Sequence, residues 1–202
     1  DTTLFKPNED TRKFYRKKYG WDDNTFVIGT VGINYLNDRK NFIGLIKAFQ
    51  GFHKAHPNSA LYLHTDVIGT ALNGVNLKYV IKSCGFDENG IFPVQYIDQI
   101  SYHLFEVPQQ ELVGNYNSFD VMCLASQGEG FGMPFLESQA CGCPLVSADT
   151  TSGRELNKSG WVIPVTEDNY LWSTHPTWYC RVWPSQIYEA LEQAYQAWER
   201  GE

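Results

Sequence analysis

The sequence lacks several features by which common protein classes are recognised. It contains no apolar run approaching the roughly 20 residues that a membrane-spanning helix needs. It has neither the G-x4-G-K-[ST] pattern of P-loop nucleotidases nor the G-x-S-x-G pattern of serine hydrolases. It also has no Asp-x-Asp pair, the usual means of holding a metal-bridged sugar diphosphate. These absences argue against each of those classes of protein and site.

The charge balance and the cysteines argue against further classes of protein. The net charge of −7 argues against non-specific nucleic-acid binding, so we expect no nucleic-acid partner. The five cysteines are odd in number and lie in apolar contexts, which argues against a disulfide framework. Cys141 and Cys143 have no second pair or histidine cluster to complete a metal site. We therefore expect no metal and no cofactor, and interpret the thiols as small buried side chains.

The residues that are present suit a single domain over 1–202. Hydrophobic residues make up 43% of the chain, which is enough to form a sizeable core. Six runs rich in β-branched and aromatic residues are predicted to be strands: 26–32, 60–65, 91–96, 119–126, 144–148 and 161–165. They lack strict alternation, which is typical of strands covered on both faces.

Helical patterns separate these runs. Helices are expected after Asn41, around 77–84, from Pro108 to about Tyr116, from Pro134 to about Cys141, and over 184–202. Repeated alternation of strand and helix predicts an α/β fold with a doubly wound parallel sheet of about six strands. Ligands of such sheets bind beyond the carboxyl ends of the strands. The site is therefore expected in the loops after Gly32, Thr65, Tyr96 and Ser126.

Two segments lie outside this alternation. Residues 8–19 form a basic helix, which we interpret as a solvated face, with docking to an anionic membrane as the alternative. Residues 166–183 are rich in aromatic side chains. They are expected either to cover one end of the sheet or to face a partner domain.

The stretch SQGEGFGMPFLESQACGCP, at 126–144, places Glu129 and Glu137 on either side of a glycine-rich turn. The glycines permit unusual backbone angles and the close approach of a ligand. The first amides of the following helix, near Gly132 and Met133, form a site for anions or hydroxyl oxygens. Each ionised carboxylate accepts two hydroxyl donors, so the pair matches the vicinal diols of a sugar and a ribose.

The loop after the first strand is predicted to lie opposite this turn. It reads GINYLNDRK and lacks the G-x-G-x-x-G pattern of dinucleotide enzymes. It carries Arg39 and Lys40 instead. Two fixed cations facing a helix N-terminus are suited to balancing a diphosphate.

These motifs resemble those of a known family. EGFGMPFLE followed by SQACGCPLVSAD resembles the E-x7-E region of retaining GT-B glycosyltransferases of the glycogen-synthase-like superfamily, also called glycosyl transferases group 1. DTTLFKP (1–7) is similar to the family's interdomain linker, and VIGTVGINYLNDRKNFIGLIKAF (27–49) to its phosphate-binding loop. ELVGNYNSFDVMCLAS (111–126) resembles the strand before the motif. The resemblance covers about residues 1–165 and implies the Rossmann-like, C-terminal half of a GT-B fold.

The resemblance also implies residue roles. Residues 1–20 would be the end of the linker plus a helix, and the N-terminal acceptor domain would be absent from this chain. The residues implied to be catalytic are Lys40, Arg39 and Glu129. Of these, Lys40 and Arg39 would hold the diphosphate, and Glu129 would contact the donor sugar. The implied donor-binding residues are Gly32, Asn34, Gly130, Phe131, Gly132, Met133 and Glu137. Glu137 would hold the ribose hydroxyls, and the base would lie near the loop after Tyr96.

The implied function is transfer of a sugar, with retention of configuration, from a nucleotide diphosphate sugar to an acceptor. The donor would be linked to UDP, GDP or ADP, and the acceptor would be a glycan, a lipid or a protein. We expect a cytoplasmic location, with attachment at a membrane surface as the alternative. The sequence departs from the family at Ile33, where many relatives have arginine, and over 166–183. A catalytically silent nucleotide-binding or interaction module, and a nucleotide-sugar epimerase of the same superfamily, are the alternative functions.

Overall fold

The structure is a computed structural model of the chain, and it describes residues 1–35, 38–69, 73–105, 107–172 and 178–202. Two parts of the sequence-based interpretation lie outside the described residues. They are positions 36–37 of the loop after the first strand and positions 173–177 of the aromatic segment.

The central sheet has six parallel strands, and each overlaps a run predicted to be a strand. In chain order they are β1 (Phe26–Val31), β2 (Ser59–His64), β3 (Val94–Tyr96), β4 (Val121–Leu124), β5 (Leu145–Ala148) and β6 (Gly160–Ile163). Their order across the sheet is β3-β2-β1-β4-β5-β6. The prediction of an α/β, doubly wound parallel sheet is confirmed. Its switch point lies between β1 and β4, so their carboxyl ends share one crevice.

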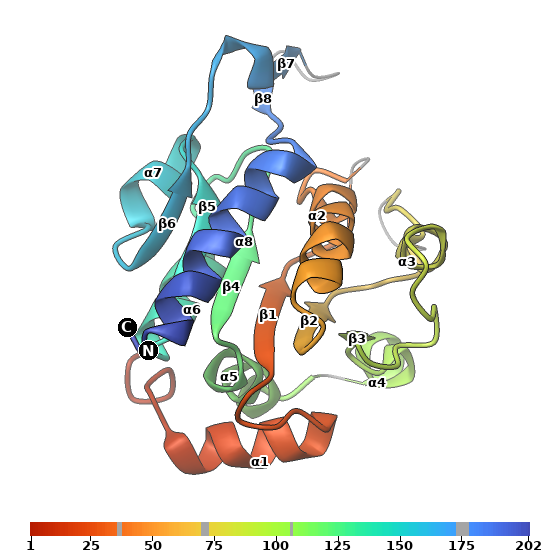
Figure 1. Ribbon diagram of the computed structural model, residues 1–202, viewed down its shortest axis with the longest axis vertical. Coiled ribbons are helices and arrows are strands. Elements are labelled where there is room, and N and C mark those ends of the chain that lie inside the picture. The colour runs from red at the N-terminus through yellow and green to blue at the C-terminus, as the bar shows by residue number, and fades with distance from the viewer. Residues whose placement is uncertain (36–37, 70–72, 106, 173–177) are drawn as a thin grey trace.

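Helices cover both faces of the sheet (Figure 1). One face packs against α2 (Phe42–Ala55), α3 (Leu77–Ser83) and α8 (Pro184–Glu199), and the other against α1 (Glu9–Tyr19), α5 (Gln109–Ser118) and α6 (Met133–Ala140). Strand β1 supplies both cores, because Phe26 and Ile28 point to the first and Val27 to the second. Burial on both faces explains why the strands show no polar alternation.

Several short elements escaped the sequence-based interpretation. They are α4 (Gln99–Leu104), α7 (Thr151–Leu156), the 3-10 turn η1 (Glu167–Asn169), and the antiparallel hairpin β7 (Tyr170–Trp172) and β8 (Trp178–Cys180). Each is too short to show a repeat of 3.6 or 2 residues in the sequence.

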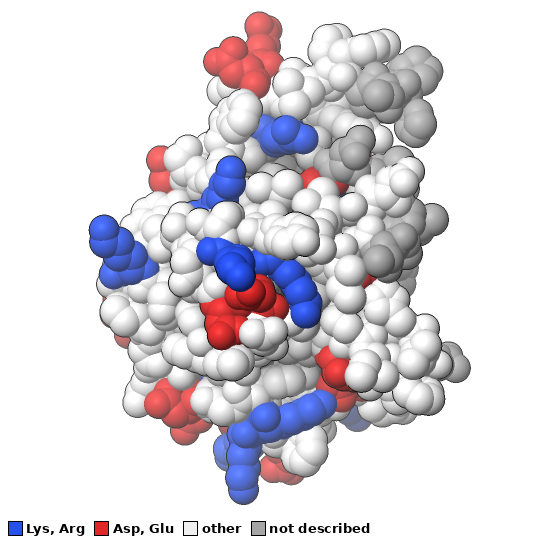
Figure 2. Space-filling model, turned by 90° about the vertical axis from the view of Figure 1, so that its right-hand side faces the viewer, with Lys and Arg blue, Asp and Glu red and all other residues white. Residues whose placement is uncertain are grey.

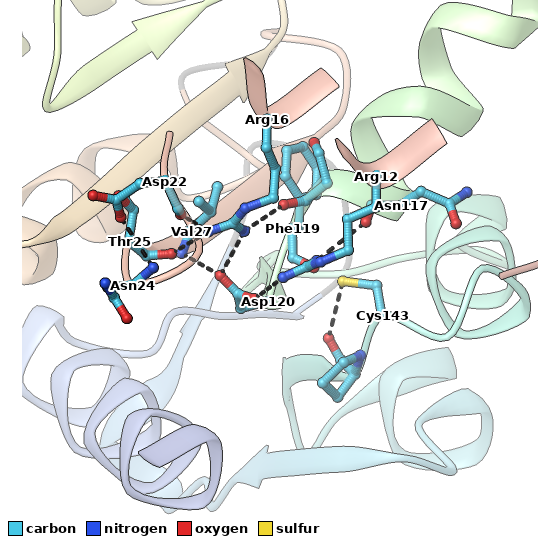
Figure 3. A network of polar contacts seen from close by, with 12 residues as sticks. Arg12, Arg16, Asp22, Asn24, Thr25, Val27, Asn117, Phe119, Asp120 and Cys143 are labelled. Atoms are coloured by element: carbon cyan, nitrogen blue, oxygen red, sulfur yellow. Dashed lines mark hydrogen bonds and ion pairs between the residues drawn. The ribbon is translucent and has the colours of Figure 1, made fainter. Parts of the chain in front are cut away.

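The interpretation of the basic helix as a solvated face is wrong for two of its five basic residues. Arg12 and Arg16 both pair with Asp120, immediately before β4, as Figure 3 shows. The Arg16 side chain is 4% exposed and also donates to the carbonyls of Asp22 and Thr25. A buried carboxylate 104 residues away therefore draws one face of α1 onto the domain, leaving Lys13, Lys17 and Lys18 exposed.

The aromatic segment is partly buried and partly exposed. Cys180 and Val182 are buried, and the Cys180 amide donates to the carbonyl of Gln127 at 2.8 Å. Trp172 and Trp178 form an exposed, edge-to-face pair with centroids 5.0 Å apart. The expectation that this segment covers one end of the sheet is therefore correct for Cys180 and Val182. Contact of the exposed tryptophans with a partner domain stays a prediction.

The charged side chains do not form a continuous basic surface on the face shown in Figure 2. Basic and acidic groups lie among one another there, between larger uncharged areas. In the described ranges, no helix has the length and apolar character needed to cross a membrane.

Candidate functional site

The loop after β1 has a constrained conformation. Asp38 and Asn41 both adopt left-handed angles, with φ of 68° and 58°, and Arg39 and Lys40 lie between them. The Asp38 carboxylate accepts hydrogen bonds from the first two amides of α2, at 2.7 and 3.1 Å. This cap satisfies amides that have no partner within the helix and holds the two cations at its start.

The turn after β4 is hydrogen-bonded to this loop. The Gln127 amide donates to the Arg39 carbonyl at 2.9 Å, and the Gln127 side chain donates to the Asp38 carbonyl at 2.8 Å. The Ser126 hydroxyl also donates to the Arg39 carbonyl, at 3.2 Å. The carboxyl ends of β1 and β4 are thus joined into one unit.

Three residues predicted to be catalytic meet in this unit. Lys40 Nζ donates to Glu129 Oε1, and Arg39 Nη1 lies 3.8 Å from Glu129 Oε2. The side chains of Lys40 and Glu129 are only 8% and 7% exposed. Burial lowers the pKa of Lys40, while the charge of Glu129 opposes that shift. Two cations facing one carboxylate leave an excess positive charge, which favours an anionic ligand.

Glu129 is also held by the first two residues of α7. Its amide donates to the Thr151 hydroxyl at 3.2 Å, and the Ser152 hydroxyl approaches its carbonyl at 3.5 Å. Thr151 has a positive φ of 47°, which is uncommon for a β-branched residue. No local sequence pattern links 129 with 151, so this support could not be predicted from the sequence.

The glycine-rich turn needs unusual backbone angles at one glycine. Gly132 has φ of +80° and lies so close to Phe135 that an added Cβ would be 2.7 Å from its ring. Gly128 and Gly130 do not have positive φ, so the expectation of unusual angles is wrong for them. Within the described part of the chain, the amides of Phe131, Gly132 and Met133 bond to no acceptor. They remain available to a ligand.

Glu137 belongs to the same helix start but has a different partner. It lies on α6, is half-buried, and its Oε2 accepts a 3.0 Å hydrogen bond from the hydroxyl of Tyr116 on α5. No described contact joins it to Glu129 or Lys40. The two glutamates are therefore held separately, one by cations and one by a tyrosine.

Gly32 and Asn34 are both predicted to bind the donor, and both belong to the loop after β1. The Lys40 stem lies against Gly32, and its Cε would be 3.4 Å from an added Cβ, which is an ordinary van der Waals contact. Asn34 is buried, and its amide group donates to the carbonyls of Asp66 and Val75 and accepts from the Val75 amide. The Asn34 side chain thus braces the neighbouring loop, and donor contact at both positions stays a prediction.

The loop after Tyr96, where the base was expected, borders a cavity of 740 Å³. Ile97 and Gln99 line it, whereas Lys40 and Glu129 do not. His64, at the end of β2, is buried, and burial lowers the pKa of its imidazole to about 4. Its Nδ1 accepts from the Asn115 amide at 2.9 Å, so we interpret His64 as a neutral packing residue.

The thiols behave as expected from the sequence, since all five cysteines are free and buried. Burial raises the pKa of Cys141 to about 11. In the residues that the structure describes, no cluster of three His, Cys, Asp or Glu side chains is suited to a metal ion. The prediction of a metal-independent site stays a prediction.

A doubly wound parallel sheet of this strand order defines a Rossmann-like domain, and the fold matches the C-terminal domains of the GT-B fold. The chain belongs to the family described as glycosyl transferases group 1, whose model matches residues 11–170. The resemblance noted in the sequence is thereby confirmed.

Two curated relatives illustrate the similarity. The chain is 46% identical over 151 residues to a D-inositol 3-phosphate glycosyltransferase of Corynebacterium jeikeium, covering 74% of this chain and 34% of the relative. It is 26% identical over 177 residues to a GDP-mannose-dependent alpha-(1-6)-phosphatidylinositol monomannoside mannosyltransferase of Mycolicibacterium smegmatis, covering 83% and 42%. The chain spans less than half the length of either relative.

Solved structures show the same fold. The C-terminal domain of the glycosyl transferase group 1 family protein LpcC from Francisella tularensis superimposes with a TM-score of 0.65 at 20% identity, covering 97% of this chain and 87% of that domain. Anabaena HepE, solved with UDP and glucose, gives a TM-score of 0.67 at 20% identity, covering 98% and 45%. In the second comparison, the chain matches less than half of the HepE chain.

Proposed function

We propose that this chain is the donor-binding domain of a retaining glycosyltransferase, and that it binds a nucleotide diphosphate sugar without a metal ion. The observation that carries the proposal is the meeting of Lys40 and Arg39 with Glu129 where β1 and β4 end. Family membership supports a transferase, and the excess positive charge of this group supports an anionic donor.

The two cations would act on the leaving group. As the bond between sugar and diphosphate breaks, negative charge develops on the diphosphate oxygens. Lys40 and Arg39 would stabilise that charge more in the transition state than in the ground state, which is the condition for catalysis. Because the cations are fixed in the protein, they would take the part that a divalent metal plays elsewhere.

Glu129 has a second part in this proposal. When the diphosphate engages Lys40, the Glu129 carboxylate becomes free to accept hydrogen bonds from the sugar hydroxyls. The unpaired amides of Phe131, Gly132 and Met133 lie next to it in the chain and would hold the sugar or a phosphate oxygen. Glu137 would accept the ribose hydroxyls.

The relatives support a nucleotide sugar as donor. One is described as GDP-mannose-dependent, and Anabaena HepE was solved with UDP-glucose. UDP, GDP and ADP donors all remain within the proposal. The acceptor, whether glycan, lipid or protein, would be bound by a second domain outside this chain. We therefore expect the chain alone to bind nucleotide but to transfer sugar poorly.

Calorimetry with UDP, GDP and ADP tests the proposal. One of the three should bind in the presence of EDTA, and Glu137→Ala should weaken that binding. Glu189→Ala, which removes an exposed carboxylate on α8, is the matched control and should have no effect. Absence of binding by all three nucleotides would overturn the proposal and favour an interaction module. The epimerase alternative is tested by analysing the products that form from a sugar nucleotide with and without acceptor. Epimerised donor in the absence of any acceptor would favour the epimerase.

A further inference from the structure

Tyr116 is the partner of the second glutamate. It lies on α5, is fully buried, and packs between Phe5 and Phe119, with ring centroids 6.2 and 6.4 Å away. Its hydroxyl donates to Glu137 Oε2 at 3.0 Å. The ring is held by the core, so the hydroxyl is a fixed point from which the glutamate side chain is oriented.

The hydrogen bond from Tyr116 engages one of the two carboxylate oxygens of Glu137. Within the described part of the chain, Oε1 has no hydrogen-bond donor, and the residue is half-buried rather than enclosed. A glutamate side chain otherwise samples many rotamers, and ordering it costs free energy when a ligand binds. A fixed hydrogen-bond donor on one carboxylate oxygen removes much of that rotamer freedom before the ligand binds.

We propose that Tyr116 is a positioning residue, which fixes Oε2 of Glu137 so that Oε1 faces the ribose diol of a bound nucleotide. This inference rests on the proposed function. The hydroxyl remains a donor at neutral pH, because burial and then the neighbouring carboxylate raise the pKa of Tyr116 well above its ordinary value. Nothing in the local sequence indicates the role, since the two residues belong to different helices.

A purely structural explanation also exists and is separable. Buried tyrosine hydroxyls usually find a hydrogen-bond partner, and Glu137 is within reach. On that explanation, Tyr116→Phe changes stability alone. On the positioning explanation, it also changes affinity for one part of the ligand, the ribose hydroxyls.

The test compares two ligands and two tyrosines. The ligands are the nucleoside diphosphate that binds best among UDP, GDP and ADP, and its 2′,3′-dideoxy counterpart. Tyr116→Phe should weaken binding of the ribonucleotide about three- to tenfold and leave binding of the dideoxy compound unchanged. Tyr15→Phe is the control, because Tyr15 lies on α1 and its hydroxyl also donates to a carboxylate, Glu111 Oε2, at 2.9 Å. It should alter neither affinity.

A third variant checks the route of action. In a Glu137→Ala background, Tyr116→Phe should have no further effect on ribonucleotide affinity. Equal losses for both ligands, or no loss for either, would overturn the inference while leaving the proposed function intact. If the wild-type chain binds none of the nucleotides, the proposed function fails and the inference fails with it.

Discussion

Arg16 Nη1 lies 3.1 Å from Oδ2 of Asp120, and both side chains are almost completely buried (Figure 3). Asp120 also pairs with Arg12 and accepts the amide of Val27 at 2.7 Å. One carboxylate thus ties the first helix to β1 and β4. These are the two strands whose carboxyl ends carry the candidate site.

Asp120→Asn should destabilise the chain strongly. The substitution leaves the buried Arg16 guanidinium without a compensating charge, and such losses cost about 3–5 kcal/mol. Urea unfolding should show this as a lower midpoint with an unchanged slope. Asp10→Asn, on the exposed side of α1, is the control and should change the free energy of unfolding by less than about 0.5 kcal/mol. A small loss at Asp120 would mean that the network contributes little.

Lys40→Met should weaken nucleoside diphosphate binding by about tenfold or more, since a hydrogen bond to a charged group contributes about 1.5–3 kcal/mol. Methionine keeps much of the apolar stem that lies against Gly32. Lys54→Met changes an exposed lysine on the same helix and should leave affinity unaltered. Calorimetry at low and high salt measures the affinity of both variants for the nucleoside diphosphate. Equal affinities for wild type and Lys40→Met would remove the cation from the proposed mechanism.

Glu129→Gln should separate binding of the diphosphate from binding of the sugar. Removing the charge frees Lys40 from its ion pair, so a nucleoside diphosphate without sugar should bind as tightly as to the wild type or more tightly. The sugar nucleotide should lose its advantage over the free diphosphate, because a carboxylate acceptor for the sugar hydroxyls is gone. Competition between the two ligands gives this ratio. Weaker binding of the free diphosphate would contradict the assigned role.

Asp38 should make stability depend on pH. Burial raises the pKa of its carboxyl from 3.8 to about 6, although two amides of α2 and the charge of Arg181 favour the ionised form. Because the folded chain holds this proton more tightly than the unfolded chain, its contribution to stability declines as pH rises from 3.8 through about 6. Relative to wild type, Asp38→Asn should therefore gain up to about 3 kcal/mol over that range.

Urea unfolding of both chains between pH 4 and pH 7 measures the effect of Asp38. His64 acts in the opposite direction, because a pKa lowered to about 4 makes stability fall as the pH decreases below its ordinary value of 6.5. It is present in both chains, so the difference between them isolates Asp38. A difference that does not change with pH would show that Asp38 is ionised throughout.

Much of the fold could be predicted because it depends on local patterns. The runs around Phe26 and Val121 are mostly apolar and lack strict alternation, which is typical of strands buried on both faces. Pro108, Pro134 and Pro184 mark helix starts because proline is tolerated in the first turn. The short elements and the left-handed angles at Asp38 and Thr151 could not be predicted, since they depend on contacts with neighbouring loops.

The sequence by itself determined that the loop carrying Lys40 and the turn carrying Glu129 would face one crevice, although 89 residues separate the two side chains. Both follow strands of a parallel sheet, and the carboxyl ends of such strands share one edge. Only the tertiary structure decided that Arg16 would be buried against Asp120 and that Tyr116 would hold Glu137. Contacts between side chains of separate helices depend on how the helices pack and rotate, and the sequence of neither helix specifies that geometry.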